Sequence, residues 1–140
     1  MADAEPIRIR AEILKKMLDH ARSEPRIEVC GLLAGRDGVI THIFPAANAL
    51  ASATAYEIAP PELFRLFKTL RAEGLIHLGH YHSHLSTENV PSPTDIEQAG
   101  YPDHAYFIVS LFEGAPEPIR AFSIRDGVVR DLEIGVIEEE

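Results

Sequence analysis

The order of short apolar segments constrains the fold of this chain most, because closely spaced turn and helix signals separate them. Two segments repeat apolar residues at helical spacing, from Ala11 to Arg22 and from Pro60 to the stop signal at Gly74. The remaining apolar segments predict strands at residues 7–10, 27–35, 39–44, 75–81, 105–112, 119–124 and 128–134. Helices and strands alternate early and strands follow one another late. This order indicates an α/β or α+β sheet domain with helices packed on the sheet.

Composition narrows the class of protein. With 140 residues, the chain is long enough for one domain, so we expect residues 1–140 to form a single domain ending in an acidic tail at residues 138–140. A net charge of -9 argues against nucleic-acid and anionic-membrane partners, which need basic patches. The start lacks the pattern of a secretory signal, and a lone cysteine fits a reducing compartment. These features favour a cytoplasmic protein.

The segment His82-Ser83-His84 is the first candidate site for chemistry. Residues two apart in an extended strand project to the same side, so both imidazoles can converge on one metal ion. Histidine is frequent here, with seven in the chain, and such a pair taken alone is more simply two surface side chains.

A second signal, Ser92-x-x-Asp95, supports two interpretations. Ser92 before Pro93 is typical of a helix N-cap, with Asp95 returning the bond in a capping box. Asp95 could instead complete a metal site with His82 and His84, although we expect that one oxygen cannot easily do both. Two histidines and one aspartate leave a fourth position for water, which is typical of catalytic zinc sites.

Glu28 is a carboxylate inside an apolar segment, where burying the charge is costly unless it is paired. It could reach water at a strand end or pair with Arg26. Alternatively it could lie beside a metal-activated water and act as general base and then acid.

Taken together, these residues resemble the JAMM (MPN+) zinc metalloprotease family. The family pattern is an upstream glutamate, then His-x-His, then Ser-x2-Asp, and here it is found as Glu28, His82, His84, Ser92 and Asp95. The resemblance extends over roughly residues 7–124 and implies a cytidine-deaminase-like fold, a mixed curved sheet flanked by helices. It implies one Zn2+ per chain on His82, His84 and Asp95, with Glu28 as acid/base and Ser92 steadying the oxyanion.

The resemblance also implies a substrate class. Small prokaryotic members are associated with ubiquitin-like sulfur-carrier proteins, so we expect cleavage of a peptide or isopeptide bond after a C-terminal Gly-Gly. The alternative is a non-catalytic MPN-type binding module, but such members typically lack the ligands. A zinc deaminase is excluded because the chain has one cysteine. Leu85 stands where the family usually has proline, which puts the rigidity of the following loop in question. The oligomeric state stays open.

Further side chains have weaker assignments. Tyr56 and the loop at residues 85–90 are candidates for lining a substrate groove. His80 shares the strand parity of the proposed ligands, and we interpret it as a packed histidine. We expect His77 on the opposite face of its strand and His104 in a loop, and we expect Cys30 to be a small buried core residue.

Overall fold

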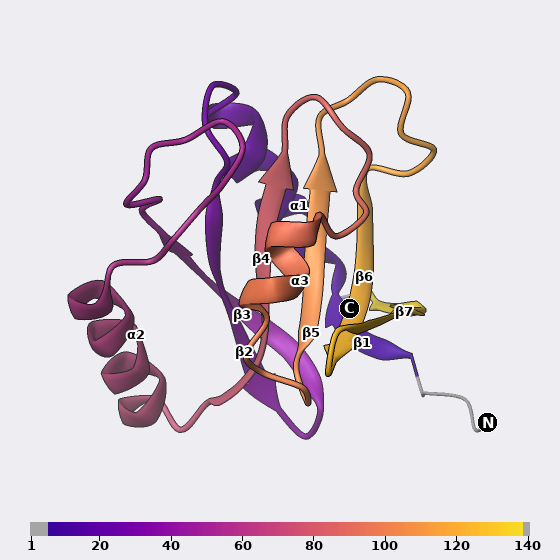
Figure 1. The fold of residues 1–140 in the computed structure, drawn as a ribbon. Coiled ribbons are helices and arrows are strands. Elements are labelled where there is room, and N and C mark those ends of the chain that lie inside the picture. Colours follow the sequence, from indigo (N-terminus) through magenta and orange to yellow (C-terminus); the bar gives the residue numbers. More distant parts are fainter. Residues whose placement is uncertain (1–5, 139–140) are drawn as a thin grey trace.

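The computed structural model describes residues 6–138, which form one sheet of eight strands and three helices. Figure 1 shows the arrangement. The elements in chain order are β1 (Ile7–Arg10), α1 (Ala11–Ser23), β2 (Cys30–Arg36), β3 (Val39–Ala46), α2 (Pro60–Ala72), β4 (Ile76–His84), α3 (Pro93–Gln98), β5 (Ala105–Ser110), β6 (Ile119–Arg125), β7 (Val128–Leu132) and β8 (Ile134–Ile137).

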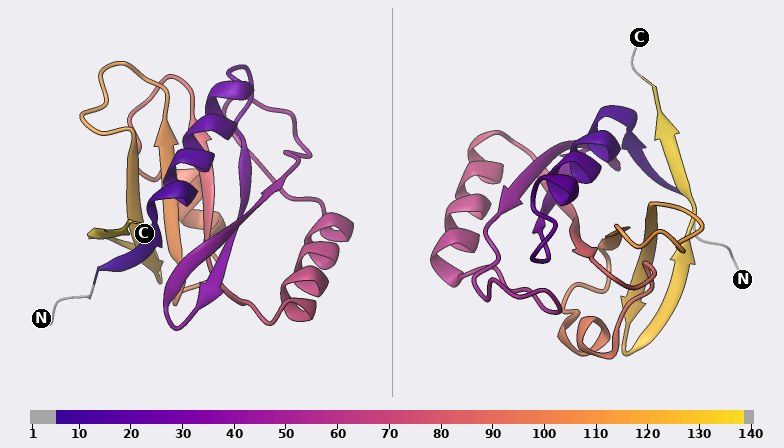
Figure 2. Two further views of the ribbon diagram at one scale, coloured as in Figure 1. Left: turned by 180° about the vertical axis from the view of Figure 1, so that it is seen from behind. Right: turned by 90° about the horizontal axis from the view of Figure 1, so that it is seen from above.

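The sheet is mixed and strongly curved. Its strand order is β7-β6-β5-β4-β2-β3-β1-β8, with β4–β5, β1–β3 and β1–β8 parallel and the other pairs antiparallel. β7 and β8 are separated only by Glu133 yet occupy opposite ends of this order, so the sheet must curve until its two edges approach. The view from above shows this curvature (Figure 2). The predicted mixed, curved sheet flanked by helices is confirmed.

One predicted strand is wrong in its bounds. The segment at residues 128–134 was expected to be continuous, but it divides at Glu133 into β7, which pairs with β6, and β8, which pairs with β1. Local alternation of apolar residues predicts an extended backbone but does not indicate a change of pairing partner. The turns at Asp37-Gly38 and Asp126-Gly127 are confirmed, because all four residues have positive φ angles, as two-residue hairpin turns require.

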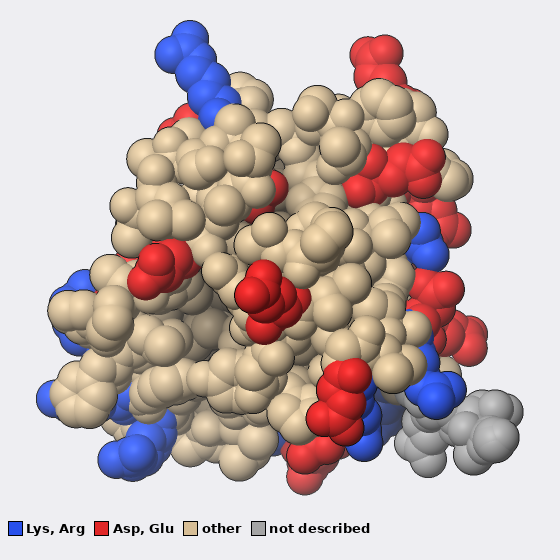
Figure 3. Space-filling view, in the orientation of Figure 1, with Lys and Arg blue, Asp and Glu red and all other residues tan. Residues whose placement is uncertain are grey.

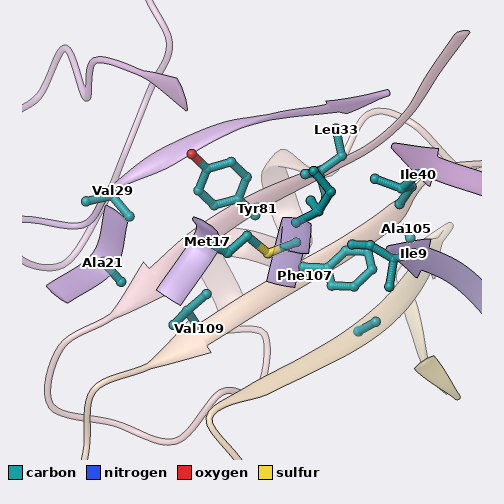
Figure 4. Packing of buried hydrophobic residues seen from close by; sticks show 12 residues of the cluster. Ile9, Met17, Ala21, Val29, Leu33, Ile40, Tyr81, Ala105, Phe107 and Val109 are labelled. Atoms are coloured by element: carbon teal, nitrogen blue, oxygen red, sulfur yellow. The ribbon is translucent and has the colours of Figure 1, made fainter. Parts of the chain in front are cut away.

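The main core lies between α1 and one face of the sheet. The helix contributes buried residues at helical spacing, including Ile13, Met17 and Ala21, because that spacing places them on one stripe. They pack on buried strand residues such as Tyr81 and Phe107 (Figure 4). His20 Nδ1 also lies 2.7 Å from the Tyr81 hydroxyl, which ties the polar edge of α1 to β4.

The opposite face of the sheet carries α2 and α3. Leu32 and Ala34 of β2 pack there with Leu70 of α2 and with Leu75, in a second and smaller apolar cluster. In Figure 1, α3 lies in front of β4 and β5 while α2 lies to one side. Side chains of β4 that point away from the α1 core therefore enter the space beside α2 and α3.

None of the helices in residues 6–138 is long and apolar enough to cross a membrane. Of the expected acidic tail, only residue 138 lies within the described residues, and the first five residues also lie outside them.

We predict that Gly31→Ala destabilises the protein by about 1–3 kcal/mol, because the added methyl group overpacks a filled space. An ideal Cβ at Gly31 would lie 2.5 Å from Tyr81 Cε1 and 2.6 Å from the backbone oxygen of Phe44. Urea unfolding measures this free energy. Gly100→Ala is the matched control, because no atom lies within 4 Å of its Cβ. Equal stability of the two variants would contradict the prediction.

Candidate metal centre

Strand β4, in the middle of the sheet, positions His82 and His84. β4 lies between β2 and β5, and Cys30 is opposite His82 in the β2–β4 register. His82 and His84 are 3% and 5% exposed, and their Nε2 atoms lie 3.3 Å apart. The flanking strands therefore hold both imidazoles with their Nε2 atoms facing each other, as the spacing predicted.

The N-terminus of α3 brings Asp95 to the same point. Ser92 caps the helix: its Oγ accepts the Asp95 N–H at 3.0 Å, and Asp95 Oδ2 accepts the Ser92 N–H at 2.9 Å. The same Oδ2 lies 3.2 Å from His82 Nε2 and 3.1 Å from His84 Nε2. The cap therefore does not keep Asp95 away from the histidines, because one oxygen contacts both the Ser92 N–H and the two imidazoles. A carboxylate oxygen has two lone pairs, and the helix end directs one to Ser92 and leaves the other for the histidines.

The tautomer of His84 makes this cluster a site for a cation. His84 Nδ1 donates to the carbonyl oxygen of Glu88 at 2.8 Å, since a carbonyl can only accept. A neutral His84 then presents a lone pair at Nε2, directly toward the acceptor oxygen of Asp95. Lone pairs at this separation repel unless a cation lies between them, so the site requires either a proton or a metal ion.

The spacing also fits a tetrahedral metal ion. The three donor atoms lie 3.1–3.3 Å from one another. Metal–nitrogen bonds of about 2.0–2.1 Å at tetrahedral angles place ligand atoms about 3.3 Å apart. His82, His84 and Asp95 could therefore hold a metal ion with little rearrangement, and they are one of two such groups among the described residues.

The charges of the cluster depend on these contacts. Burial alone would raise the pKa of Asp95, but hydrogen bonds with His82 and His84 outweigh it and hold the pKa well below its usual range. Burial lowers the pKa of His82, whereas hydrogen bonds to Asp95 and Glu88 raise that of His84 despite its burial. The site therefore presents an ionised carboxylate beside His82, whose burial favours the neutral, metal-binding form.

Glu28 lies beside the same cluster, just before β2 rather than inside a strand. Its backbone N–H bonds to the Ser52 carbonyl at 2.8 Å, and the next residue, Val29, bonds through its N–H to Ser83 Oγ at 2.9 Å. Glu28 is 5% exposed, so it does not sit at an open strand end. Burial raises its pKa to about 7, which His84 opposes and Asp95 reinforces electrostatically.

A cavity of about 390 Å³ opens on this face between α2 and α3. The face is visibly hollowed there (Figure 3). Tyr56 lines the cavity and stacks on His82 with ring centroids 4.6 Å apart, so it connects the cavity to the metal cluster. The other lining residues are Leu32, Glu57, Ile58, Leu63, His80, Gln98, Gly100, Tyr101 and Tyr106.

The loop after His84 is held without the proline that Leu85 replaces. Besides the His84–Glu88 bond, Ser110 Oγ donates to the Thr87 carbonyl at 2.6 Å. The fully buried Asn89 donates through Nδ2 to the Glu117 carbonyl at 2.8 Å. Hydrogen bonds to β5 and to the segment before β6 thus supply the restraint that a rigid proline ring would provide.

The remaining histidines correct one prediction. His77 was expected on the opposite face of β4, but a register irregularity shifts the strand by one residue: Leu33 pairs with Gly79, and the adjacent Ala34 pairs with His77. A bulge reverses the alternation of side chains, so His77 lies with His80, at 4.6 Å between ring centroids. His80 is packed and His104 lies in a loop, both as expected. Cys30 is fully buried, also as expected.

Comparisons with known proteins agree with this geometry. The family model described as prokaryotic homologs of the JAB domain matches residues 10–125. The CysO-cysteine peptidase of Mycobacterium tuberculosis is 34% identical over 134 residues, covering 94% of this chain and 91% of that protein. The desampylase of Haloferax volcanii is 36% identical, covering 73% of this chain and 78% of its own. The solution structure of protein DSY2949 from Desulfitobacterium hafniense has a TM-score of 0.83 at 34% identity, covering 94% of this chain and 93% of that one.

The raised pKa of Glu28 predicts a pH dependence of stability in metal-free protein. The folded state holds this proton more tightly than the unfolded chain, whose pKa is 4.5, against about 7 in the fold. The stability due to Glu28 is therefore complete below pH 4.5 and is lost as the pH rises to about 7. Urea unfolding in chelator at pH 4.5, 6 and 7.5 measures this loss. Glu28→Gln should show a smaller loss than the unchanged protein, and parallel profiles would contradict the assignment.

Proposed function

The chain belongs to the family of prokaryotic homologs of the JAB domain, and on that premise we propose that it is a zinc metallopeptidase of the JAMM type. Its substrates are conjugates of ubiquitin-like or sulfur-carrier proteins, and the scissile peptide or isopeptide bond follows their C-terminal Gly-Gly. Its relatives support this substrate class, since one is a CysO-cysteine peptidase and another a desampylase. The observation that carries the proposal is the convergence of His82, His84 and Asp95 within 3.3 Å.

His82, His84 and Asp95 would hold one Zn2+ per chain. Two imidazole nitrogens and one carboxylate oxygen suit zinc and leave a position open for water or substrate. When bound, zinc lowers the pKa of water to about 7 and polarises a carbonyl group. The hydrogen bond from His84 Nδ1 to the Glu88 carbonyl fixes the ring so that Nε2 faces the ion.

Glu28 would move the proton of the reaction. Its buried carboxyl accepts a proton from the attacking water and then delivers that proton to the leaving amine. A pKa of about 7 suits both steps, because the group is then readily ionised and readily protonated near neutral pH. The Asn48 side chain, which donates to the Glu28 carbonyl oxygen at 2.9 Å, fixes the backbone from which this carboxyl projects.

Ser92 would stabilise the developing oxyanion. Its Oγ already accepts the Asp95 N–H, so the hydroxyl proton is available for a different acceptor. A donor fixed in place by a helix cap loses little entropy when negative charge develops on the substrate oxygen. The same residue therefore ends a loop, begins a helix and serves the reaction.

A substrate protein that ends in Gly-Gly suits this buried site. Glycine residues have no Cβ, so an extended Gly-Gly backbone can come close to a buried centre. Tyr56, stacked on His82 at the cavity wall, is positioned to contact such a tail.

The proposal also includes the domain organisation and the cellular location of the enzyme. All eight strands found within residues 6–138 share one sheet, which supports the proposal of a single metallopeptidase domain over residues 1–140. A cytoplasmic location fits Cys30, which is buried and is the single cysteine of the chain.

Two substitutions separate metal binding from proton transfer. Glu28→Gln should retain one zinc ion and lose at least about 100-fold in cleavage rate, because the amide cannot accept the proton. His82→Ala should lose both the zinc and the activity. The measurements are zinc content by mass spectrometry and cleavage of a sulfur-carrier protein extended beyond its Gly-Gly.

Glu97→Gln is the matched control, because Glu97 is an exposed carboxylate on α3. It should keep both zinc and activity. Full activity in Glu28→Gln would refute the role of Glu28, and full activity in protein that lacks zinc would refute the metallopeptidase.

A further inference from the structure

Three further histidines gather outside the site described above. His77 and His80 come from β4, and His104 comes from the loop before β5. Each offers a ring nitrogen, and these nitrogens lie within 4.8 Å of one another. The bulge at Leu78 makes this grouping possible, because regular alternation would place His77 on the α1 side of the sheet.

One pair of nitrogens in this group has the spacing of the proposed zinc ligands. His104 Nδ1 lies 3.3 Å from His80 Nε2, the same separation as between the Nε2 atoms of His82 and His84. The ring of His77 lies 4.6 Å from that of His80 and 4.2 Å from that of His104, against 5.0 Å for the His82–His84 pair. The ring plane of His77 is inclined by 68° to that of His80 and by 70° to that of His104. The corresponding angle between His82 and His84 is 62°.

A backbone hydrogen bond sets the tautomer of His77. His77 Nε2 donates to the Gly79 carbonyl at 3.1 Å, so the neutral ring presents its lone pair at Nδ1. Burial lowers the pKa of His77 to about 4 and lowers that of His104 as well. Near neutral pH, protonation of these two rings therefore competes little with a metal ion.

Neighbouring aromatic rings hold two of the imidazoles in place. Tyr101 stacks on His104 with centroids 4.8 Å apart, and Tyr106 stacks on His80 at 5.1 Å. Such packing lowers the entropy that each ligand loses on binding. The three nitrogens, now within 4.8 Å of one another, come to a spacing of about 3.3 Å when a tetrahedral ion binds all of them.

The surroundings favour a cation. His80, Tyr101 and Tyr106 line the cavity, so an ion bound to His80 is accessible from it. On this face, acidic side chains stand over the middle, and Lys and Arg lie toward the periphery (Figure 3). A negative field over a cavity concentrates cations at its mouth.

We propose that His77, His80 and His104 form a second metal site, separate from His82, His84 and Asp95, for a divalent late-transition ion such as Zn2+, Co2+ or Ni2+. Three imidazole nitrogens suit this class of ion and leave a position open to a small ligand from the cavity. The second site binds more weakly than the first, because it has no carboxylate ligand to offset the charge of the ion.

A cobalt titration tests the proposal. Chelator-treated protein is titrated with Co2+, and the visible absorption and the bound metal are measured after desalting into a low, fixed Co2+ concentration. The unchanged protein should bind two equivalents. His104→Phe should bind one, because phenylalanine preserves the stacking on Tyr101 but has no ligand nitrogen. His77→Phe should give the same result, and circular dichroism checks that both variants fold.

The two sites are distinguished by further variants. His84→Ala should bind one Co2+ equivalent, at the weaker second site. His84→Ala combined with His104→Phe should bind none. His42→Ala is the control, because His42 contacts Thr41 and Phe44 away from both groups, and it should retain two. The second site would be overturned if both phenylalanine variants bound two equivalents. It would also be overturned if the unchanged protein bound one equivalent and both variants still bound it. Neither result would affect the first site.

Discussion

The convergence of three polar atoms at one point is the constraint on which this structure depends. His82 Nε2, His84 Nε2 and Asp95 Oδ2 meet within 3.3 Å, an arrangement that requires a shared proton or a metal ion between these atoms. A central strand fixes the first two and a helix cap fixes the third. Packing of the apolar core on the other face of the sheet supports the strand that carries both histidines.

Much of the fold could be predicted because local signals and tertiary structure agree. The amphipathic spacing of α1 and the Asp37-Gly38 turn act over a few residues, and both are found as expected. The division at Glu133 could not be predicted, because it depends on which distant strand each half reaches. The position of His77 was missed for a similar reason, since a bulge is set by pairing with β2 rather than by the residues of β4.

The pairing of His82 with His84 could be predicted because it is local in sequence, whereas Asp95 was assigned to the same site by the resemblance to a family pattern. Strand alternation brings His82 to His84, and the capping box brings Asp95 to the helix start. What sequence reasoning could not give was the sharing of one oxygen between cap and cluster, which depends on how α3 lies against β4. The stacking of Tyr56 on His82 depends in the same way on a loop fold that no short motif specifies.

The parallel pairing of β1 with β8 has a consequence for how the chain folds. The two strands are the first and last elements of the described chain, so their contacts close the longest loop between its paired strands. Contacts of this kind form late and slow the overall folding reaction. Until they form, β1 offers an unpaired edge that can pair with another chain. When β8 is not paired, the open edge is that of β1, which lies three places from the ligand-bearing β4 in the strand order.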